Sequence, residues 1–482
     1  MQPKLELLDA ELLQKIVGEA FALLAEPGIR VQAADAVELL AGAGARVENG
    51  VARIPEALVR RALASAPREF FLHNRAGEPV VRYGGDAVHF DPGSSCVHIL
   101  DPQTLRHRMT QTADLERLVQ VAEMLPQYAA QSTAVVCEDA PQEIGDLWRL
   151  HVVLRHSNKP IVTGAFSAHT APGMIDLLAA DCGGRATLKA KPRAIFDVCP
   201  SPPLHYSDFA AQNLVDLARA GVPAEIISVP MAGATAPVTL AGAVVQHAAE
   251  CLAGIVIHQL AQAGAPVVWG GAPAIFDMRT GITPMGAIET AMLNAACSQV
   301  GKYFGLPTHG YLGGSDAKIL DAQAGMESAS ALLLGALAGI NMISGAGMLD
   351  SLACHSAEKL AFDAEAIAAA QRVLAGIRPR GDSLATEIFA KAGFAGEFLK
   401  LPETRRLFRA EQHLPSALID RGTLHSWEQG GSQDVFTRAR GRVNELVAAY
   451  KRPELPEKLE SEWKAILQEQ TRSAGLQQAA RQ

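Results

Sequence analysis

The seven cysteines of this 482-residue chain are scattered, and none belongs to a CxxC pair. Isolated cysteines in odd number exclude a disulfide framework and a zinc knuckle of the usual spacing. HExxH and paired-histidine motifs are also absent, so we expect no metal site. The first 13 residues are acidic and helical in pattern, unlike a signal peptide. Together with the reduced thiols, this pattern predicts a cytoplasmic protein.

Long apolar runs and basic clusters are missing as well. No apolar run reaches 18 residues without a polar interruption, so we predict no membrane-spanning helix. Basic residues are dispersed and the net charge is −8, which excludes a basic face for nucleic acid. The phosphate-binding patterns GxGxxG after a first strand and GxxxxGKS/T are absent. Hydrophobic residues at 49% and charged residues at 20% are typical of a soluble protein with a sizeable core.

Short apolar segments alternate with longer helical patterns through the middle of the chain. Such alternation predicts βαβ units and a parallel sheet. The expected strands cover 132–137, 160–166, 194–199, 224–229, 266–270, 307–312 and 340–343. A closed (β/α)8 TIM barrel needs one more strand, which lies either at 88–90 or beyond residue 355. An open, doubly wound sheet is the alternative fold.

Three regions are expected on these patterns. Residues 1–110 combine helical periodicity with later strand periodicity and are predicted to form an N-terminal α+β extension. Residues 111–360 form the (β/α)8 barrel core. Residues 361–482 are helical and more charged, and we expect them to pack on the barrel and also to offer a surface for homo-oligomers.

Aromatic residues make up only 5% of the chain, so their positions are informative. Several occur in or just after predicted strands, where α/β folds build their sites. An aromatic face attracts a quaternary ammonium group by roughly 0.5–2 kcal/mol. The candidate substrate-binding rings are Phe90, Phe166, Tyr206, Trp269 and Tyr311. The competing interpretation is that these rings pack the interior, although Tyr311 has small glycine neighbours in HGYLGG.

The stretch GGSDAK follows Tyr311. Its Ser315 or Asp316 has the ordinary explanation of a helix N-cap. Lys318 in the same stretch is a candidate for binding an anionic group of a substrate.

A second polar stretch follows the last predicted strand. If it is helical, Asp350, Cys354 and Glu358 share one face, and Ser351 and His355 share another. Asp350 and His355 are then the candidate catalytic residues, as general bases, and Glu358 is a candidate for substrate binding. A Cys354 nucleophile is disfavoured because no activating arrangement is evident.

Four segments resemble the trimethylamine methyltransferase superfamily. They read PMAGATAPVTLAGAVVQHAAECLAGIVIHQL, GGAPAIFDMRTG, GLPTHGYLGGSDAKILDAQAGMESA and LAGINMISGAGMLDSL. The resemblance extends over nearly the whole chain, and the GATAPVTLAGA run followed by the SDAKxxDxQAG run is specific. Founding members carry pyrrolysine in a GYL-X-SG stretch, where this chain has GMLDSL. Asp350 thus falls at the pyrrolysine position, and the chain resembles the non-pyrrolysine branch, best known for glycine betaine:corrinoid methyltransfer.

The resemblance implies a (β/α)8 barrel that moves a methyl group from an amine to the Co(I) centre of a separate corrinoid protein. No tightly bound cofactor is then expected, because the cobalamin belongs to the partner. The expected substrate is a quaternary amine, glycine betaine or a related betaine, whose nitrogen is already a neutral leaving group. Two alternatives remain open: a folate or thiol as the methyl acceptor, and a non-catalytic betaine-binding barrel.

Overall fold

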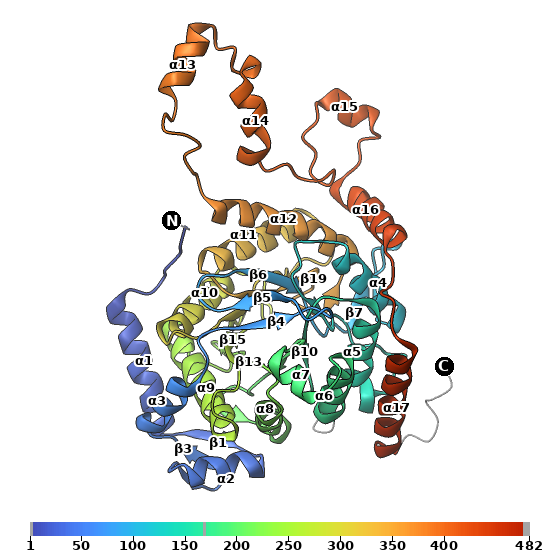
Figure 1. Ribbon diagram of the computed structural model, residues 1–482. Helices are drawn as coiled ribbons and strands as arrows, with labels where there is room; N and C mark the ends of the chain where they lie inside the picture. Colours follow the sequence, from blue (N-terminus) through green and yellow to red (C-terminus); the bar gives the residue numbers. More distant parts are fainter. Residues whose placement is uncertain (1–2, 167–169, 476–482) are drawn as a thin grey trace.

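The computed structural model describes residues 3–166 and 170–475 (Figure 1). The chain begins with a small α+β unit, made of α1 (Ala10–Ala25), β1 (Ile29–Val31), α2 (Ala34–Gly42), β2 (Arg46–Glu48), β3 (Val51–Arg53) and α3 (Glu56–Ser65). The Asp9 carboxylate caps α1 by accepting the Leu12 N–H at 2.8 Å. The short strand β12 (His205–Tyr206) pairs in parallel with β1 and so attaches this unit to the rest of the chain.

A β-hairpin covers the amino-terminal ends of the central strands. It consists of β4 (Phe70–His73) and β5 (Pro79–Tyr83), paired antiparallel. Its buried side chains pack against the first inward-facing residues of the strands, in a cluster of Leu72, Val81, Tyr83, Ala130, Val162, Ile195, Val268 and Met342. Because this apolar plug fills one end, the carboxyl-terminal ends of the strands are the face where a site can be built.

Eight parallel strands form the centre of the molecule. They are β6 (His89–Pro92), β9 (Gln131–Ser132), β10 (Ile161–Gly164), β11 (Ala194–Val198), β13 (Ala224–Ser228), β15 (Val267–Gly271), β17 (His309–Tyr311) and β18 (Met342–Ala346). Hydrogen bonds join them in the orders β15-β13-β11-β10-β9 and β17-β18-β6, and every one of these pairs is parallel. The prediction of a parallel α/β fold is confirmed.

These two groups of strands also contact each other at both edges. Trp269 of β15 forms a parallel bridge with Thr308, next to β17. At the other edge the Ala129 N–H, just before β9, donates to the Phe90 carbonyl of β6 at 2.9 Å. Of the two positions considered for an eighth strand, residues 88–90 are therefore the correct one. This strand lies inside the segment 1–110 that the sequence assigns to an extension, and it pairs with β18 at the far end of the series.

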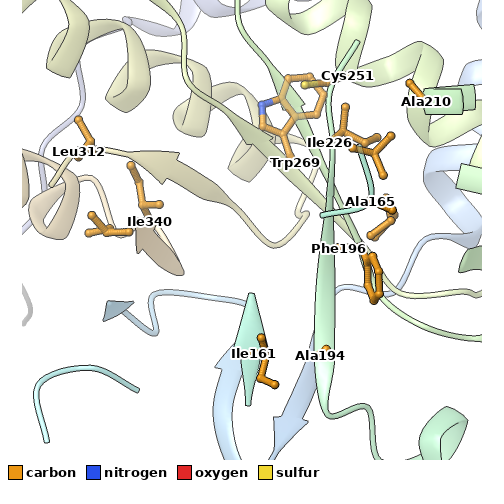
Figure 2. Close-up of a cluster of buried hydrophobic side chains, with 14 of the residues drawn as sticks. Ile161, Ala165, Ala194, Phe196, Ala210, Ile226, Cys251, Trp269, Leu312 and Ile340 are labelled. Atoms are coloured by element: carbon orange, nitrogen blue, oxygen red, sulfur yellow. The ribbon is translucent and has the colours of Figure 1, made fainter. Parts of the chain in front are cut away.

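Helices follow the strands and cover their outer face. They are α4 (Thr112–Glu123), α5 (Gly145–His156), α6 (Thr170–Asp181), α8 (Asp208–Ala220), α9 (Leu240–Ala261), α10 (Ile288–Tyr303), α11 (Ala322–Leu337) and α12 (Ala357–Ala375). Figure 2 shows part of the intervening core, with Phe196, Ile226 and Trp269 on the strands and Cys251 of α9 near Trp269. Each fully buried side chain of this size contributes roughly 1.5–3 kcal/mol.

Helix α9 is the one helix in the described part of the chain that is long and apolar enough to cross a membrane. Its most apolar 18-residue window is 83% buried inside the fold. Contacts with α1, α8, α3 and α10 surround it, so its apolar composition is explained by its place in the core.

The C-terminal region contains α13 (Thr386–Ala392), α14 (Pro402–Glu411), α15 (Leu424–Gln429), α16 (Val435–Ala449) and α17 (Glu457–Ser473). Helix α16 packs on α12 and α4, and α17 packs on α6. Residues 376–417, all of which the structure describes, differ from these two helices because none of them is buried.

Candidate functional site

The segment after β18 is a β-hairpin and not a helix. Its strands are β19 (Met348–Leu349) and β20 (Cys354–His355), which pair antiparallel. In the turn, Asp350, Ser351 and Leu352 have φ angles of 52°, 52° and 74°, in the left-handed region. Side chains disfavour this region in a helix. The predicted helical stripes through Asp350 and His355 are therefore wrong.

Hydrogen bonds hold this turn against the loop of residues 313–318. The Asp350 N–H donates to the Ala317 carbonyl at 2.9 Å, and the Ser351 hydroxyl donates to the Asp316 carboxylate at 2.7 Å. The Lys318 ammonium group pairs with the Asp350 carboxylate at 2.7 Å, and the two side chains are 59% and 32% exposed. The predicted site residues Asp350 and Lys318 thus lie together, on an exposed rim where an ion pair contributes little to stability.

His355 is enclosed by packing and lies apart from this rim. Its side chain is fully buried, and β20 pairs with β7 (His98–Leu100). Gly347 has a φ of 84°, and a Cβ atom there would lie 2.3 Å from the His355 ring. Burial lowers the pKa of His355 to about 3, so the imidazole is neutral. An enclosed ring cannot reach a substrate at the strand ends, and the structure does not support His355 as a catalytic base.

Glu358 faces a different cavity. It lies in the first turn of α12, and its buried carboxylate accepts a hydrogen bond from the Ser356 hydroxyl at 3.2 Å. It lines a cavity of about 280 Å³ together with Arg117 of α4 and Arg440 of α16. The sequence prediction that Glu358 and Tyr311 share one substrate site is therefore not supported.

Three of the predicted aromatic residues belong to the packed core. Phe90, Tyr206 and Trp269 are all at most 1% exposed. The Tyr206 hydroxyl donates to the Glu250 carbonyl at 3.0 Å, and the Trp269 indole N–H donates to the Cys297 carbonyl at 2.9 Å. Both partners lie on the surrounding helices α9 and α10, so these rings point away from the space between the strands. The interpretation that rings pack the interior is correct for these three.

Phe166 and Tyr311 remain at the carboxyl-terminal ends of the strands. Phe166 follows β10 and is 42% exposed, and its ring folds back over Gly164, where a Cβ atom would lie only 2.8 Å from it. The Arg149 guanidinium group lies 5.7 Å from the Phe166 ring centroid. Tyr311 ends β17, and its hydroxyl accepts the Ser94 N–H at 2.9 Å. These two rings are the predicted site aromatics that could contact a ligand.

Beneath Tyr311 lies a layer of carboxylates that the sequence reasoning missed. Asp91 on β6, Asp197 on β11 and Glu225 on β13 are 0%, 6% and 0% exposed. Each alternates along its strand with an outward-facing apolar residue, so each points into the space between the strands. Burial raises the pKa of Asp91 and of Glu225, and repulsion from the Asp197 carboxylate adds to this rise. Asp197 and Glu225 are register partners on the neighbouring strands β11 and β13.

A hydrogen-bonded chain links Asp91 and Glu225 to their neighbours. The Ser344 hydroxyl donates to Asp91 Oδ1 at 2.5 Å and lies 2.9 Å from His309 Nε2. The Tyr83 hydroxyl donates to Glu225 Oε1 at 2.5 Å. His309 Nδ1 and Glu225 Oε2 are 3.6 Å apart, which is too long for a hydrogen bond. Burial lowers the pKa of His309 to about 3, so this contact is not an ion pair.

Asp197 differs from the other two carboxylates. Burial raises its pKa from 3.8 to about 7, and the pKa values of Asp91 and Glu225 rise well above their ordinary range. Among residues 3–166 and 170–475, no hydrogen-bond partner reaches Asp197 Oδ1, Asp91 Oδ2 or Glu225 Oε2, but Asp91 and Glu225 each accept a hydrogen bond on the other oxygen. An unpartnered carboxylate that is partly open is a functional-site candidate, because a cationic ligand would remove its desolvation cost.

A signal for these residues was present in the sequence. AIFDVC and PAEIIS are strands in which one acidic residue interrupts an otherwise buried apolar segment. Lone carboxylates in buried strands are rare without a role. The described part of the chain contains no cluster of three His, Cys, Asp or Glu side chains with metal-binding geometry. Of the three carboxylates, Asp197 has a pKa of about 7 and can supply negative charge near neutral pH.

Comparison with known proteins gives the chain its family. The profile described as "Trimethylamine methyltransferase (MTTB)" matches residues 1–475. Trimethylamine methyltransferase MttB of Desulfitobacterium hafniense (strain DSM 10664 / DCB-2) is 30% identical over 461 residues, which cover 95% of this chain and 92% of that protein. Glycine betaine methyltransferase of Desulfitobacterium hafniense (strain Y51) is 30% identical over 475 residues, which cover 98% of each.

The solved structure of the Methanosarcina barkeri monomethylamine methyltransferase MtmB is similar in fold. It has a TM-score of 0.52 at 14% identity and covers 92% of this chain and 89% of that one. At this identity the similarity concerns the fold alone. The match of the family profile along almost the full length shows that this chain belongs to the trimethylamine methyltransferase (MttB) family.

Proposed function

We propose that the eight strands close into a (β/α)8 barrel and that the protein transfers a methyl group from a quaternary amine to the Co(I) centre of a corrinoid protein. The observation that carries this proposal is the layer of buried carboxylates Asp91, Asp197 and Glu225, which lies below Tyr311. The ionised Asp197 carboxylate beneath an aromatic ring suits an onium group, which is attracted by both. The proposed regions are an N-terminal extension (1–110), a barrel core (111–360) and a C-terminal helical region (361–482). Strand β6 lies within the first of these and is counted as a barrel strand.

The proposed reaction needs little acid–base chemistry. The N–CH3 bond breaks with its electron pair left on nitrogen, so a quaternary amine leaves as a neutral tertiary amine without a proton donor. Co(I) of the partner supplies the nucleophile that takes the methyl group. Asp197 holds the cation, the Tyr311 and Phe166 rings contact its methyl groups, and the burial of the carboxylate layer excludes water. Positioning of this kind accounts for much of the rate in such transfers.

A betaine would add a carboxylate to this cation. The proposed partner for it is Lys318, which lies at the rim and pairs with Asp350. The seven free cysteines fit the proposed cytoplasmic location.

The direct test supplies the purified protein with a corrinoid protein kept in the Co(I) state. Glycine betaine, other betaines and trimethylamine are added one at a time, and methylation is followed by the loss of Co(I) absorbance and by mass spectrometry of the demethylated amine. We expect transfer from at least one quaternary amine and none from trimethylamine. Transfer to a folate or thiol without a corrinoid, or tight betaine binding without methyl loss, would contradict the proposal.

Binding of a quaternary amine is expected to tighten as the pH rises. Asp197 has a raised pKa of about 7, so it holds a proton below that pH and carries the attracting charge above it. Between pH 6 and pH 8 the ionised fraction rises about tenfold, and the dissociation constant of glycine betaine should fall by a similar factor. Calorimetric titration measures this. The Asp197→Asn variant serves as the control and should bind weakly at both pH values.

The free protein should show the opposite trend in stability. A carboxyl group whose pKa is raised by folding stabilises the fold at low pH, and this contribution is lost as the pH rises from about 4 through 7. Tm of the wild-type protein should therefore fall over this range by more than Tm of Asp197→Asn. Identical pH profiles for the two proteins would show that Asp197 titrates normally.

A further inference from the structure

Residues 376–417 form an arm that projects from the molecule, with α13 and α14 beyond the helices that cover the strands (Figure 1). The structure describes every residue of the arm, and none is buried. Helices α13 and α14 contain 7 and 10 residues. Isolated helices this short are not stable in water without tertiary packing. The arm therefore needs a surface that its own chain does not provide.

The arm carries a concentration of exposed apolar side chains. Ile377 is 99% exposed and Phe394 is fully exposed, and the others are Leu384, Phe389, Leu399, Phe408 and Leu414. Within the arm the Phe389 ring contacts that of Phe398, with centroids 5.3 Å apart. Single exposed apolar residues are ordinary, but a concentration of them in one unburied segment is typical of a protein–protein interface.

The base of the arm is fixed to α12 of its own chain. The Arg372 guanidinium group donates to the Glu411 carbonyl at 3.0 Å, and the Ser416 N–H donates to the Glu365 carboxylate at 3.1 Å. Arg380 forms an ion pair with the Glu411 side chain across the two ends of the arm. These contacts direct the apolar tip away from its own chain, so an external surface must cover it.

A groove that fits the arm lies near its base. The groove has a volume of about 740 Å³, and its apolar lining includes Leu320, Met326, Phe362, Leu418 and Phe436. Three carboxylates, Asp321, Asp420 and Asp434, also line it, against a single cation, Arg438. Helix α14 has the complementary character, because it carries Arg405, Arg406 and Arg409 beside Leu407 and Phe408. Opposite charges around matching apolar surfaces favour this pairing and set its orientation.

We propose that the arm docks into this groove on a second copy of the same chain. The exchange is reciprocal in a two-fold assembly, because each copy carries both the arm and the groove. A second copy is favoured over the corrinoid protein because α13 and α14 need a packing surface that stays in place throughout the catalytic cycle. The corrinoid protein must leave after each methyl transfer, and α13 and α14 would then lose their only packing surface at every turnover.

The assembly would also touch the candidate site. Ile319 and Leu320 line the groove and directly follow Lys318, which pairs with Asp350 at the rim. The arm of one copy would therefore pack behind the rim of the other.

The test measures the mass of the full-length protein by sedimentation velocity. We expect the wild type to have at least twice the mass of one chain. Phe394→Asp, at a fully exposed position, and Met326→Asp in the groove should each give the mass of one chain with an unchanged circular dichroism spectrum. Met278→Asp replaces an equally exposed methionine that lies outside the arm and the groove, and it should keep the wild-type mass.

A second measurement identifies the contact itself. Phe394→Cys and Met326→Cys chains are mixed and treated with a bifunctional thiol reagent, and we expect a linked dimer that contains one chain of each kind. A wild-type mass equal to one chain would overturn the proposal, and so would an unchanged mass for Phe394→Asp. A wild type that gains mass only when the corrinoid protein is added would assign the arm to that partner instead.

Discussion

Replacing Asp197 by Asn is expected to lower kcat/KM for the quaternary amine by roughly 30- to 5000-fold. Loss of one member of a buried charge pair costs about 2–5 kcal/mol, which corresponds to that range in rate. The carboxylate has no hydrogen-bond partner on Oδ1 among the described residues, so the substitution breaks no internal contact there. Tm of the variant at pH 8 should equal or exceed that of the wild type, because a buried charge has been removed.

Asp350→Asn is the matched control, since the sequence patterns made Asp350, like His355, a candidate general base. Its carboxylate is 32% exposed and its partner Lys318 is 59% exposed, and such pairs contribute about 0–1 kcal/mol. We expect a change of less than about fivefold in kcat/KM. A loss at Asp350 as large as that at Asp197, or an Asp197→Asn enzyme with full activity, would refute the assignment of the cation site.

Asp181→Asn is expected to destabilise the protein by about 3–5 kcal/mol, because it leaves buried guanidinium charge without a counter-ion. The Asp181 side chain is fully buried and pairs with both Arg193 and Arg75, the latter at 3.0 Å. Arg193 also donates to the carbonyls of Asn158 and Lys159, each at 2.8 Å, so the pair connects the segment before β10 to that before β11. The effect is measured as a lower midpoint of urea unfolding.

Asp176 on the same helix α6 provides the comparison. It is 42% exposed and pairs with Arg185, which is 60% exposed. Asp176→Asn makes the same chemical change at a solvent-exposed site, and it should lower the free energy of unfolding by less than about 1 kcal/mol. Equal losses of stability for the two variants would show that burial of the Asp181 ion pair is not the cause.

The alternation of apolar segments and helical patterns was sufficient to predict the parallel α/β fold. Residues 194–199 and 224–229 were predicted as strands, and β11 and β13 occupy Ala194–Val198 and Ala224–Ser228. Such patterns are reliable because burial of both faces of a strand and of one face of a helix depends on local composition. The motif around Tyr311 was likewise enough to place that ring at a strand end.

The composition of the site could not be predicted in the same way. In AIFDV, Phe196 and Asp197 are adjacent, and which of them faces inward depends on the parity of the strand relative to all its neighbours. The hairpin at Asp350 forms because Ala317 and Asp316 bind its turn from another loop, against local preference. Whether a side chain meets the ligand or the core is thus set by contacts between residues distant in sequence, which a local pattern does not contain.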